Sequence, residues 1–133
     1  MAMKATRTNL NEYTVTNQDG TSLKVSPQGT PGAFSPGELL QAALLGCATL
    51  SADLQLAHML GKDFEAEASV KSTEEDNHIS DMLFEFLIQT EGRDEQEREK
   101  IVKAAAKKID QLCIVKRSLN KGINTETDIT AEP

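Results

Sequence analysis

Residues 35–60 read SPGELLQAALLGCATLSADLQLAHML, the most apolar stretch of this 133-residue chain. It opens as a helix should, because Ser35 is a good N-cap and Pro36 suits the first helical position. Glu38 then stands where a capping box places its carboxylate. Gly61 supplies a C-terminal stop. We therefore predict a helix over 36–60.

Leucine and alanine occupy almost every side of that helix. Scattered polar residues interrupt them, among them Gln41, Thr49, Asp53 and Gln55. An amphipathic surface helix keeps one polar face, so a helix without one must be covered on most sides. The cover is either a strongly layered core or a partner chain.

The segments before and after this helix predict strands and a second helix. Asp19-Gly20 between two β-prone runs is a strong hairpin signal, and Asp94-x-x-Glu97 repeats the capping-box pattern at the start of an amphipathic run. We expect an α+β fold in a single domain. Its elements are strands over 1–26, a loop over 27–35, the helix over 36–60, strands over 63–90, a helix over 94–112, a short helical turn over 113–119 and a strand over 122–130. Apolar residues alternate along 82–88 and along 123–129, and the expected core stripe of the second helix is Ile101, Ala105, Ile109 and Leu112.

Composition restricts the class of protein. A net charge of -7 and a pI near 4.8 argue against nucleic acid and anionic membrane as partners, since both need clustered Lys and Arg. The N-terminus has no signal-peptide pattern, and no apolar run of about 18 residues is free of polar breaks, so we expect no membrane span. Two cysteines without a secretory signal indicate reduced thiols in the cytoplasm.

The two cysteines are the best candidates for chemistry. Cys47 lies in the middle of the apolar helix and Cys113 closes the second helix, so both are expected to be buried. If they meet in the fold, they form a redox-capable pair. The alternative, that both are small core residues, stays equally open at this point.

Reactivity depends on the thiolate, which an ordinary cysteine forms to only about 3% at neutral pH. Cys47 is more than three turns from the start of its own helix, so that helix dipole cannot help it, and it needs a cation from elsewhere. Cys113 is followed by Lys116 and Arg117. On local electrostatics alone, Cys113 is the better nucleophile.

Glu38 already has a complete structural role as the capping-box carboxylate. Nine helical residues place Glu38 and Cys47 on opposite sides of the helix, roughly 13 Å apart along its axis. If both are catalytic, the glutamate must serve a second copy of the chain. Neither His58 nor His78 has a second ligand at metal-like spacing, so we expect no metal and no cofactor.

Three segments taken together resemble the osmotically inducible protein C / organic hydroperoxide resistance (OsmC/Ohr) family. They are residues 35–40, 42–47 and 113–119, and they reproduce the family's spacing from Glu38 to Cys47 and from Cys47 to Cys113. The resemblance implies an OsmC-like intertwined homodimer, with long apolar central helices wrapped by antiparallel β-sheets. It also implies sites at the subunit interface.

The resemblance further implies a thiol-dependent peroxidase that reduces organic hydroperoxides, with hydrogen peroxide as a further candidate substrate. Cys47 matches the reactive cysteine, Cys113 would resolve its sulfenic acid to a disulfide, and an external dithiol, for example of lipoyl type, would reduce that disulfide. Glu38 would hold an activating arginine. Arg7, the only arginine before Arg93, is the candidate.

A second hypothesis assumes the same fold but assigns no reaction to the cysteines. The same dimer would hold a small hydrophobic ligand in an apolar interface pocket, with inert cysteines. The feature that separates the two hypotheses is an arginine within reach of Cys47, because a thiol without a nearby cation has no evident reason to react fast.

Overall fold

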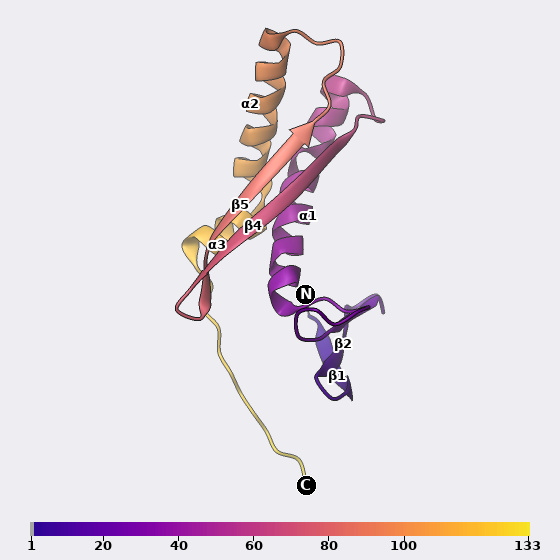
Figure 1. Ribbon diagram of the computed structural model, residues 1–133, viewed down its shortest axis with the longest axis vertical. Helices are drawn as coiled ribbons and strands as arrows, with labels where there is room; N and C mark the ends of the chain where they lie inside the picture. The colour runs from indigo at the N-terminus through magenta and orange to yellow at the C-terminus, as the bar shows by residue number, and fades with distance from the viewer. Residues whose placement is uncertain (1) are drawn as a thin grey trace. The chain divides into compact units, whose positions relative to one another are not determined.

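The computed structural model describes residues 2–133 (Figure 1). They divide into two compact units, residues 2–43 with 70–83, and residues 44–69 with 84–133. The α+β class predicted from the sequence is confirmed. The elements in chain order are β1 (Lys4–Asn9), β2 (Glu12–Thr16), β3 (Ser22–Val25), α1 (Pro36–Leu60), β4 (Ala66–Glu75), β5 (His78–Ile88), α2 (Glu95–Leu112) and α3 (Ile114–Lys121).

The first unit contains a three-stranded antiparallel sheet in the order β1-β2-β3. Its β2–β3 turn is the predicted hairpin. Asn17 accepts the N–H groups of Asp19 and Thr21 on its side-chain oxygen, both at 3.0 Å. Gly20 then takes a φ of 88°, a left-handed conformation that glycine adopts without a steric penalty. Local turn chemistry therefore sets the register of β2 against β3.

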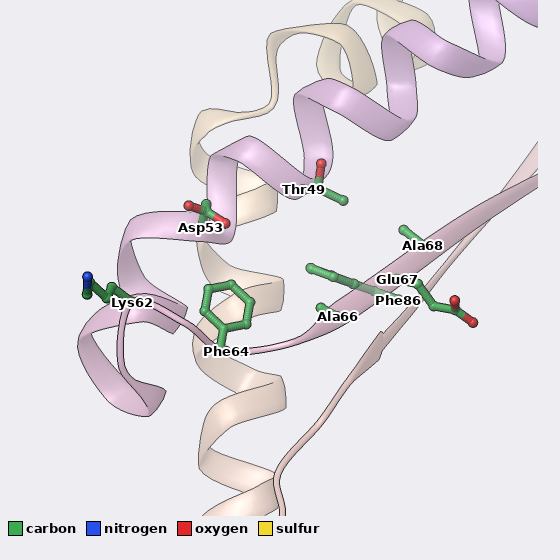
Figure 2. Close-up of a pocket in the computed structure, with 8 residues that line it drawn as sticks. All are labelled: Thr49, Asp53, Lys62, Phe64, Ala66, Glu67, Ala68 and Phe86. Atoms are coloured by element: carbon green, nitrogen blue, oxygen red, sulfur yellow. The ribbon is translucent and has the colours of Figure 1, made fainter.

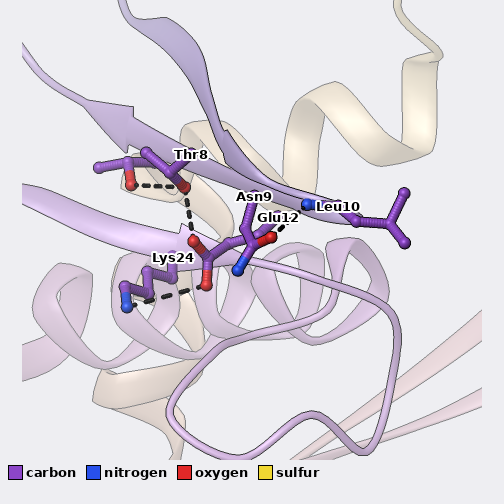
Figure 3. A network of polar contacts seen from close by, with 6 residues as sticks. Thr8, Asn9, Leu10, Glu12 and Lys24 are labelled. Atoms are coloured by element: carbon purple, nitrogen blue, oxygen red, sulfur yellow. Dashed lines mark hydrogen bonds and ion pairs between the residues drawn. The ribbon is translucent and has the colours of Figure 1, made fainter.

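A polar network ties the three strands together near the β1–β2 turn (Figure 3). Thr8 donates to a Glu12 carboxylate oxygen at 2.6 Å, and the other Glu12 oxygen lies 3.7 Å from Lys24 Nζ on β3. Thr14 donates to Thr8 at 3.3 Å. The register of β1 shifts between Arg7 and Asn9, on either side of Thr8. Because these groups are exposed, they add little stability and act mainly on register.

Helix α1 has the bounds expected from the sequence. The Ser35 N–H donates to Glu38 Oε1 at 2.8 Å and the Glu38 N–H donates to Ser35 Oγ at 3.2 Å, which completes the capping box. Before it, the predicted loop is held at both ends, since Ser26 donates to the Phe34 carbonyl and Phe34 donates to the Lys24 carbonyl.

Only one stripe of α1 is buried. Its buried residues are Leu44, Ala48, Ala52 and Leu56. Leu50 and Leu54 lie on the other side, 75% and 84% exposed. A single chain therefore covers only part of the apolar surface of α1.

By length and composition alone α1 is apolar enough to cross a membrane, although it contains the polar breaks seen in the sequence. The polar breaks are too few to lower its mean hydropathy below that of a span. A core helix of a soluble protein meets the same criterion, so this result does not distinguish a membrane-spanning helix from a core helix.

Strands β4 and β5 pair as a two-stranded sheet. Asp76 and Asn77 join them with φ values of 46° and 64°, the left-handed pair that a tight two-residue hairpin needs. Burial alternates along β5, where Phe84 and Phe86 are half-buried and pack edge to face at 5.7 Å between ring centroids. The alternation predicted for this strand is confirmed.

Helices α1 and α2 run antiparallel within the second unit. At one end the Arg93 guanidinium donates to the Met59 carbonyl at 3.2 Å, and at the other end the two cysteines meet. Asp94 caps α2 by accepting the Glu97 N–H at 2.8 Å, as the sequence predicts. The buried stripe of α2 consists of Ile101, Ala105 and Ile109.

The end of that stripe differs from the expectation. Leu112, predicted to belong to the core, is 57% exposed, whereas Cys113 is 0% exposed. The reason is that the helix ends at Leu112 and the extended conformation of Cys113, with φ -75° and ψ 95°, turns its side chain inward instead.

Two predictions for the C-terminal region are corrected by the structure. The helical turn expected over 113–119 is a full helix, α3, which begins at Ile114 and ends at Lys121. Residues 122–130, expected to form a strand, have no regular secondary structure. A strand exists only through hydrogen bonds to a neighbour, and apolar-polar alternation alone provides none.

Candidate functional site

The two cysteines lie together in the second unit. The Cys47 and Cys113 side chains lie close enough to shift each other's pKa, although 66 positions separate them in sequence. Cys47 comes from the middle of α1 and Cys113 from the junction of α2 and α3. Cys113 is fully buried and Cys47 is partly exposed, so only one of the two residues is open to a reactant.

The pKa of the Cys47 thiol is lowered. Burial, the largest single effect, raises its pKa, but hydrogen bonds outweigh it. In order of size they come from the backbone of Val115, the side chain of Cys113, the backbone of Ile114 and the side chain of Ser51. The backbone at the start of α3 and the Cys113 side chain thus hold the pKa of this thiol below its usual value, while the Ser51 hydroxyl also donates to the Cys47 carbonyl at 2.6 Å.

The pKa of Cys113 is raised, first by burial and then by the neighbouring Cys47, against a smaller opposing effect from the Lys116 backbone. This reverses the expectation from local electrostatics. The Lys116 ammonium is 2.7 Å from Asp110 Oδ1, and the Arg117 guanidinium donates to the Gln111 carbonyl at 3.3 Å. Both cations are thus engaged with other groups, and Cys113 keeps its proton.

Cys113 also joins two helices. Its N–H donates to the Ile109 carbonyl at 2.9 Å and caps the end of α2. Its sulfur accepts the Lys116 N–H at 3.4 Å and caps the start of α3. These bonds fix the backbone at Cys113, and the side chain is held where it meets Cys47.

Glu38 and Arg7, the other two candidates, belong to the first unit. The pKa of the Glu38 carboxyl is lowered by hydrogen bonds from the Ser35 backbone and hydroxyl. One of its oxygens is thereby used in capping α1, as the sequence predicts. Its catalytic role remains a prediction.

Arg7 lies on β1 opposite Tyr13 and is exposed. Its guanidinium has no hydrogen-bond or ion-pair partner within residues 2–133. Structure places it in an ordered strand, one residue before the register shift, and leaves its catalytic role a prediction as well.

A separate hollow of about 320 Å³ lies in the second unit, between α1 and the β4–β5 sheet (Figure 2). Neither cysteine lines it. Two phenylalanine rings meet charged side chains there, so it is not the purely apolar pocket of the second hypothesis. The lining residues are Thr49, Asp53, Lys62, Phe64, Ala66, Glu67, Ala68 and Phe86.

The backbone groups of α3 that lower the pKa of Cys47 were not predicted from the sequence. A search for a cationic side chain cannot find them, because a backbone N–H leaves no mark in residue type. The one available signal was Cys113 itself, a residue able to cap the helix that begins at Ile114.

The chain is an α+β protein in which a partly exposed thiol in the middle of α1 lies near a buried thiol at the α2–α3 junction, and comparison with known proteins supplies the family. Residues 29–128 match the model of the family described as OsmC-like protein. The chain belongs to this OsmC-like family.

An uncharacterized protein of Mycobacterium tuberculosis is 27% identical over 125 residues, covering 92% of this chain and 91% of its own. An OsmC-like protein from Mycoplasma pneumoniae has the same fold, with a TM-score of 0.68 at 15% identity over 90% of this chain and 86% of its own. A Psychrobacter arcticus protein named for an osmotic stress induced and detoxification response aligns with a TM-score of 0.62 at 19% identity, over 89% and 87% of the two chains.

Proposed function

We propose that this protein is a thiol-dependent peroxidase that reduces organic hydroperoxides, with Cys47 as the nucleophile and Cys113 as the resolving cysteine. One observation carries the proposal: the two thiols, distant in sequence, lie close enough to shift each other's pKa. The opposite pKa directions give each sulfur the ionisation that its role needs. Hydrogen peroxide is a second candidate substrate.

The first step takes place at the more exposed sulfur. The Cys47 thiolate attacks the distal oxygen of the hydroperoxide, so that an S–O bond forms and the O–O bond breaks. The bonding pair leaves on the alkoxide, which takes a proton and departs as an alcohol. Cys47 is left as a sulfenic acid.

Resolution uses the enclosed sulfur. Cys113 loses its proton and attacks the Cys47 sulfur, the S–S bond forms, and the departing hydroxide takes that proton to leave as water. Overall, two thiols and one hydroperoxide give one disulfide, one alcohol and one water. An external dithiol, of lipoyl type for example, then restores both thiols by exchange. Such a cycle suits the cytoplasm, where structural disulfides are rare.

A homodimer is part of the same proposal. Leu50 and Leu54 give α1 an exposed apolar flank, and large side chains of this kind normally mark an interface when they gather on one face. On the helix this flank is contiguous with Cys47, because positions 47, 50 and 54 follow each other at intervals of three and four. A second copy covering the flank would enclose the reactive sulfur.

Arg7 and Glu38 enter the proposal through that second copy. Helix geometry keeps Glu38 away from Cys47 of its own chain. Glu38 uses Oε1 for its cap, and its Oε2 makes no hydrogen bond within residues 2–133. The exposed Arg7 is the candidate partner of that oxygen, and held by Glu38 it would activate the thiolate of a second copy.

Titration with cumene hydroperoxide tests the reaction. The reduced protein is expected to lose two thiols per peroxide and to form an intramolecular disulfide. Cys47→Ser should lose both responses. Cys113→Ser should stop at a sulfenic acid that dimedone traps at Cys47.

The matched control is the Cys113→Ser protein alkylated at Cys47 before peroxide is added, which should consume none. If both thiols of the unmodified protein remain reduced in a large excess of hydroperoxide, the peroxidase proposal is refuted. That result would favour the second hypothesis, a non-catalytic dimer that binds a small hydrophobic ligand. Sulfenic acid found at Cys113 rather than Cys47 would reverse the assigned roles.

A further inference from the structure

Strand β1 is an edge strand with one unpaired side. Within residues 2–133 it pairs with β2 only, and all 6 of its residues are exposed. The other edge of the sheet is partly occupied, because Val25 of β3 bridges to Phe34 and the Phe34 N–H donates to the Lys24 carbonyl. An exposed edge offers a row of main-chain donors and acceptors to which a further strand can pair. The β1 edge is therefore the side of this sheet that is open to another strand.

Residues 122–130 have the pattern of a strand, although they have no regular secondary structure in the single chain. The segment repeats β-branched residues at every second position, which favours a strand. They are Ile123, Thr125, Thr127 and Ile129. Both isoleucines are exposed, Ile123 to 67% and Ile129 to 87%. This segment therefore lacks a neighbouring strand, whereas β1 lacks a partner on one side.

The sheet that contains β1 has two chemically different faces. Residues directly opposite each other in a sheet point to the same face. Ala5 is opposite Val15, and Val15 is opposite Leu23, so these three side chains make one face apolar. Lys4 is next to Ala5 and opposite Thr16, so it points to the other face, which is polar.

The segment 122–130 matches both faces. A strand that turned Ile123 and Ile129 to the apolar face would turn Glu126 and Asp128 to the face of Lys4, because side chains alternate along a strand. Charge favours the same pairing. Strand β1 carries two cationic residues and no acidic one, whereas residues 122–133 carry acidic residues and no cationic one. Opposite charges on neighbouring strands stabilise their pairing.

We propose that residues 122–130 of one copy pair as a strand with the β1 edge of a second copy, and that the exchange is reciprocal. A second copy is the partner because each chain carries both complementary elements, so one two-fold exchange pairs every edge and every segment. The exposed Leu50 and Leu54 of α1 call for a second copy independently. The inference rests on the homodimer of the proposed function and not on its peroxidase reaction.

Zero-length cross-linking tests both the contact and the copy that supplies it. A carbodiimide joins a carboxylate to an amine only when the two groups touch, so it should join Lys4 to Glu126 or Asp128. Isotope-labelled and unlabelled full-length protein are unfolded together, refolded and cross-linked, and the peptides are read by mass spectrometry. We expect cross-links that join a labelled peptide to an unlabelled one. Cross-links between peptides of the same isotope only, or none from Lys4 to the segment, would overturn the inference.

Hydrogen exchange of the full-length protein gives a second test. Thr127→Pro and Asp128→Pro each remove one main-chain N–H from the segment, and one of the two must face β1, since successive N–H groups point to opposite edges. The segment has no regular structure in the single chain, so neither proline disturbs the fold of one copy. The matched control is Ala131→Pro, outside the segment.

The readout is the exchange of the β1 amides, which lie far from the substituted positions in sequence. In at least one of the two segment variants these amides should exchange at least about tenfold faster than in Ala131→Pro, because the edge loses its cover. Equal exchange of β1 in all three variants would overturn the inference.

The thiols take part in neither test, so the two proposals can fail separately. A dimer that reduces hydroperoxide without cross-links between copies keeps the peroxidase and loses the strand exchange. A protein that gives those cross-links but does not react with hydroperoxide keeps the strand exchange and loses the peroxidase.

Discussion

Replacing Cys113 separates its two contributions, the lowering of the Cys47 pKa by its side chain and the cap on α3. Cys113→Ala removes both, whereas Cys113→Ser keeps a hydroxyl that can donate to Cys47 and accept from Lys116. Neither variant can form the disulfide. The comparison between them therefore isolates the hydrogen bonds from the redox chemistry.

The size of the effect follows from one lost donor. Because S–H is a weak donor, we assign its bond to the thiolate about 1 kcal/mol, the value typical of neutral hydrogen bonds. Below the thiol pKa, that energy corresponds to about fivefold in thiolate fraction. Cys47 of the alanine variant should then alkylate about five times more slowly at neutral pH than Cys47 of the serine variant. The lost cap should cost a further roughly 1 kcal/mol in unfolding free energy.

The assay is the rate of iodoacetamide alkylation at Cys47 across a pH series, with urea unfolding measured in parallel. A smaller side chain at position 113 also opens access to Cys47, but access changes the plateau rate at high pH and not the midpoint of the profile. A midpoint for Cys113→Ala equal to that of Cys113→Ser would refute the reasoning.

Three more outcomes follow from the geometry. Leu54→Glu should weaken the proposed dimer at least about a hundredfold in sedimentation equilibrium, because each copy loses a leucine that the dimer would bury, worth about 1.5 kcal/mol or more. Leu10→Glu, also at a leucine exposed in the single chain, should not weaken the dimer. Leu56→Ala, at a fully buried position, should lower the free energy of unfolding by about 3 kcal/mol in urea, and a loss below about 1 kcal/mol would contradict the described core. Folding lowers the pKa of Glu38, so its carboxylate stabilises the fold above the unfolded-state pKa, and this stability is lost as the pH falls through the folded-state pKa. The free energy of unfolding of Glu38→Gln, measured across acidic pH, should lack this pH dependence. The same pH dependence in both proteins would argue against the capping box.

Short-range patterns in the sequence predicted the elements well. Ser35 and Glu38 stand three residues apart, and their reciprocal hydrogen bonds start α1 at the expected residue. Asp94 does the same for α2. Gly20 and the left-handed pair Asp76 and Asn77 close the hairpins. Each of these features depends on groups within a few residues of each other, so sequence alone contains the relevant physics.

Features that depend on distant segments were predicted less well. Residues 122–130 alternate like a strand but find no neighbouring strand among residues 2–133, so alternation alone misled. The apolar surface of α1 pointed to cover, yet only the tertiary structure shows that the chain buries this helix along Leu44, Ala48, Ala52 and Leu56.

The Cys47 thiol shows the same division most clearly. Sequence alone determined that Cys47 lies in an apolar helix, too far from the start of that helix to gain from its dipole, and that any effect on its ionisation must come from elsewhere in the fold. Tertiary structure decided the source. The backbone of Ile114 and Val115 and the side chain of Cys113 lower the pKa of this thiol, and backbone N–H groups are the same in every sequence, so only the fold can bring them near Cys47.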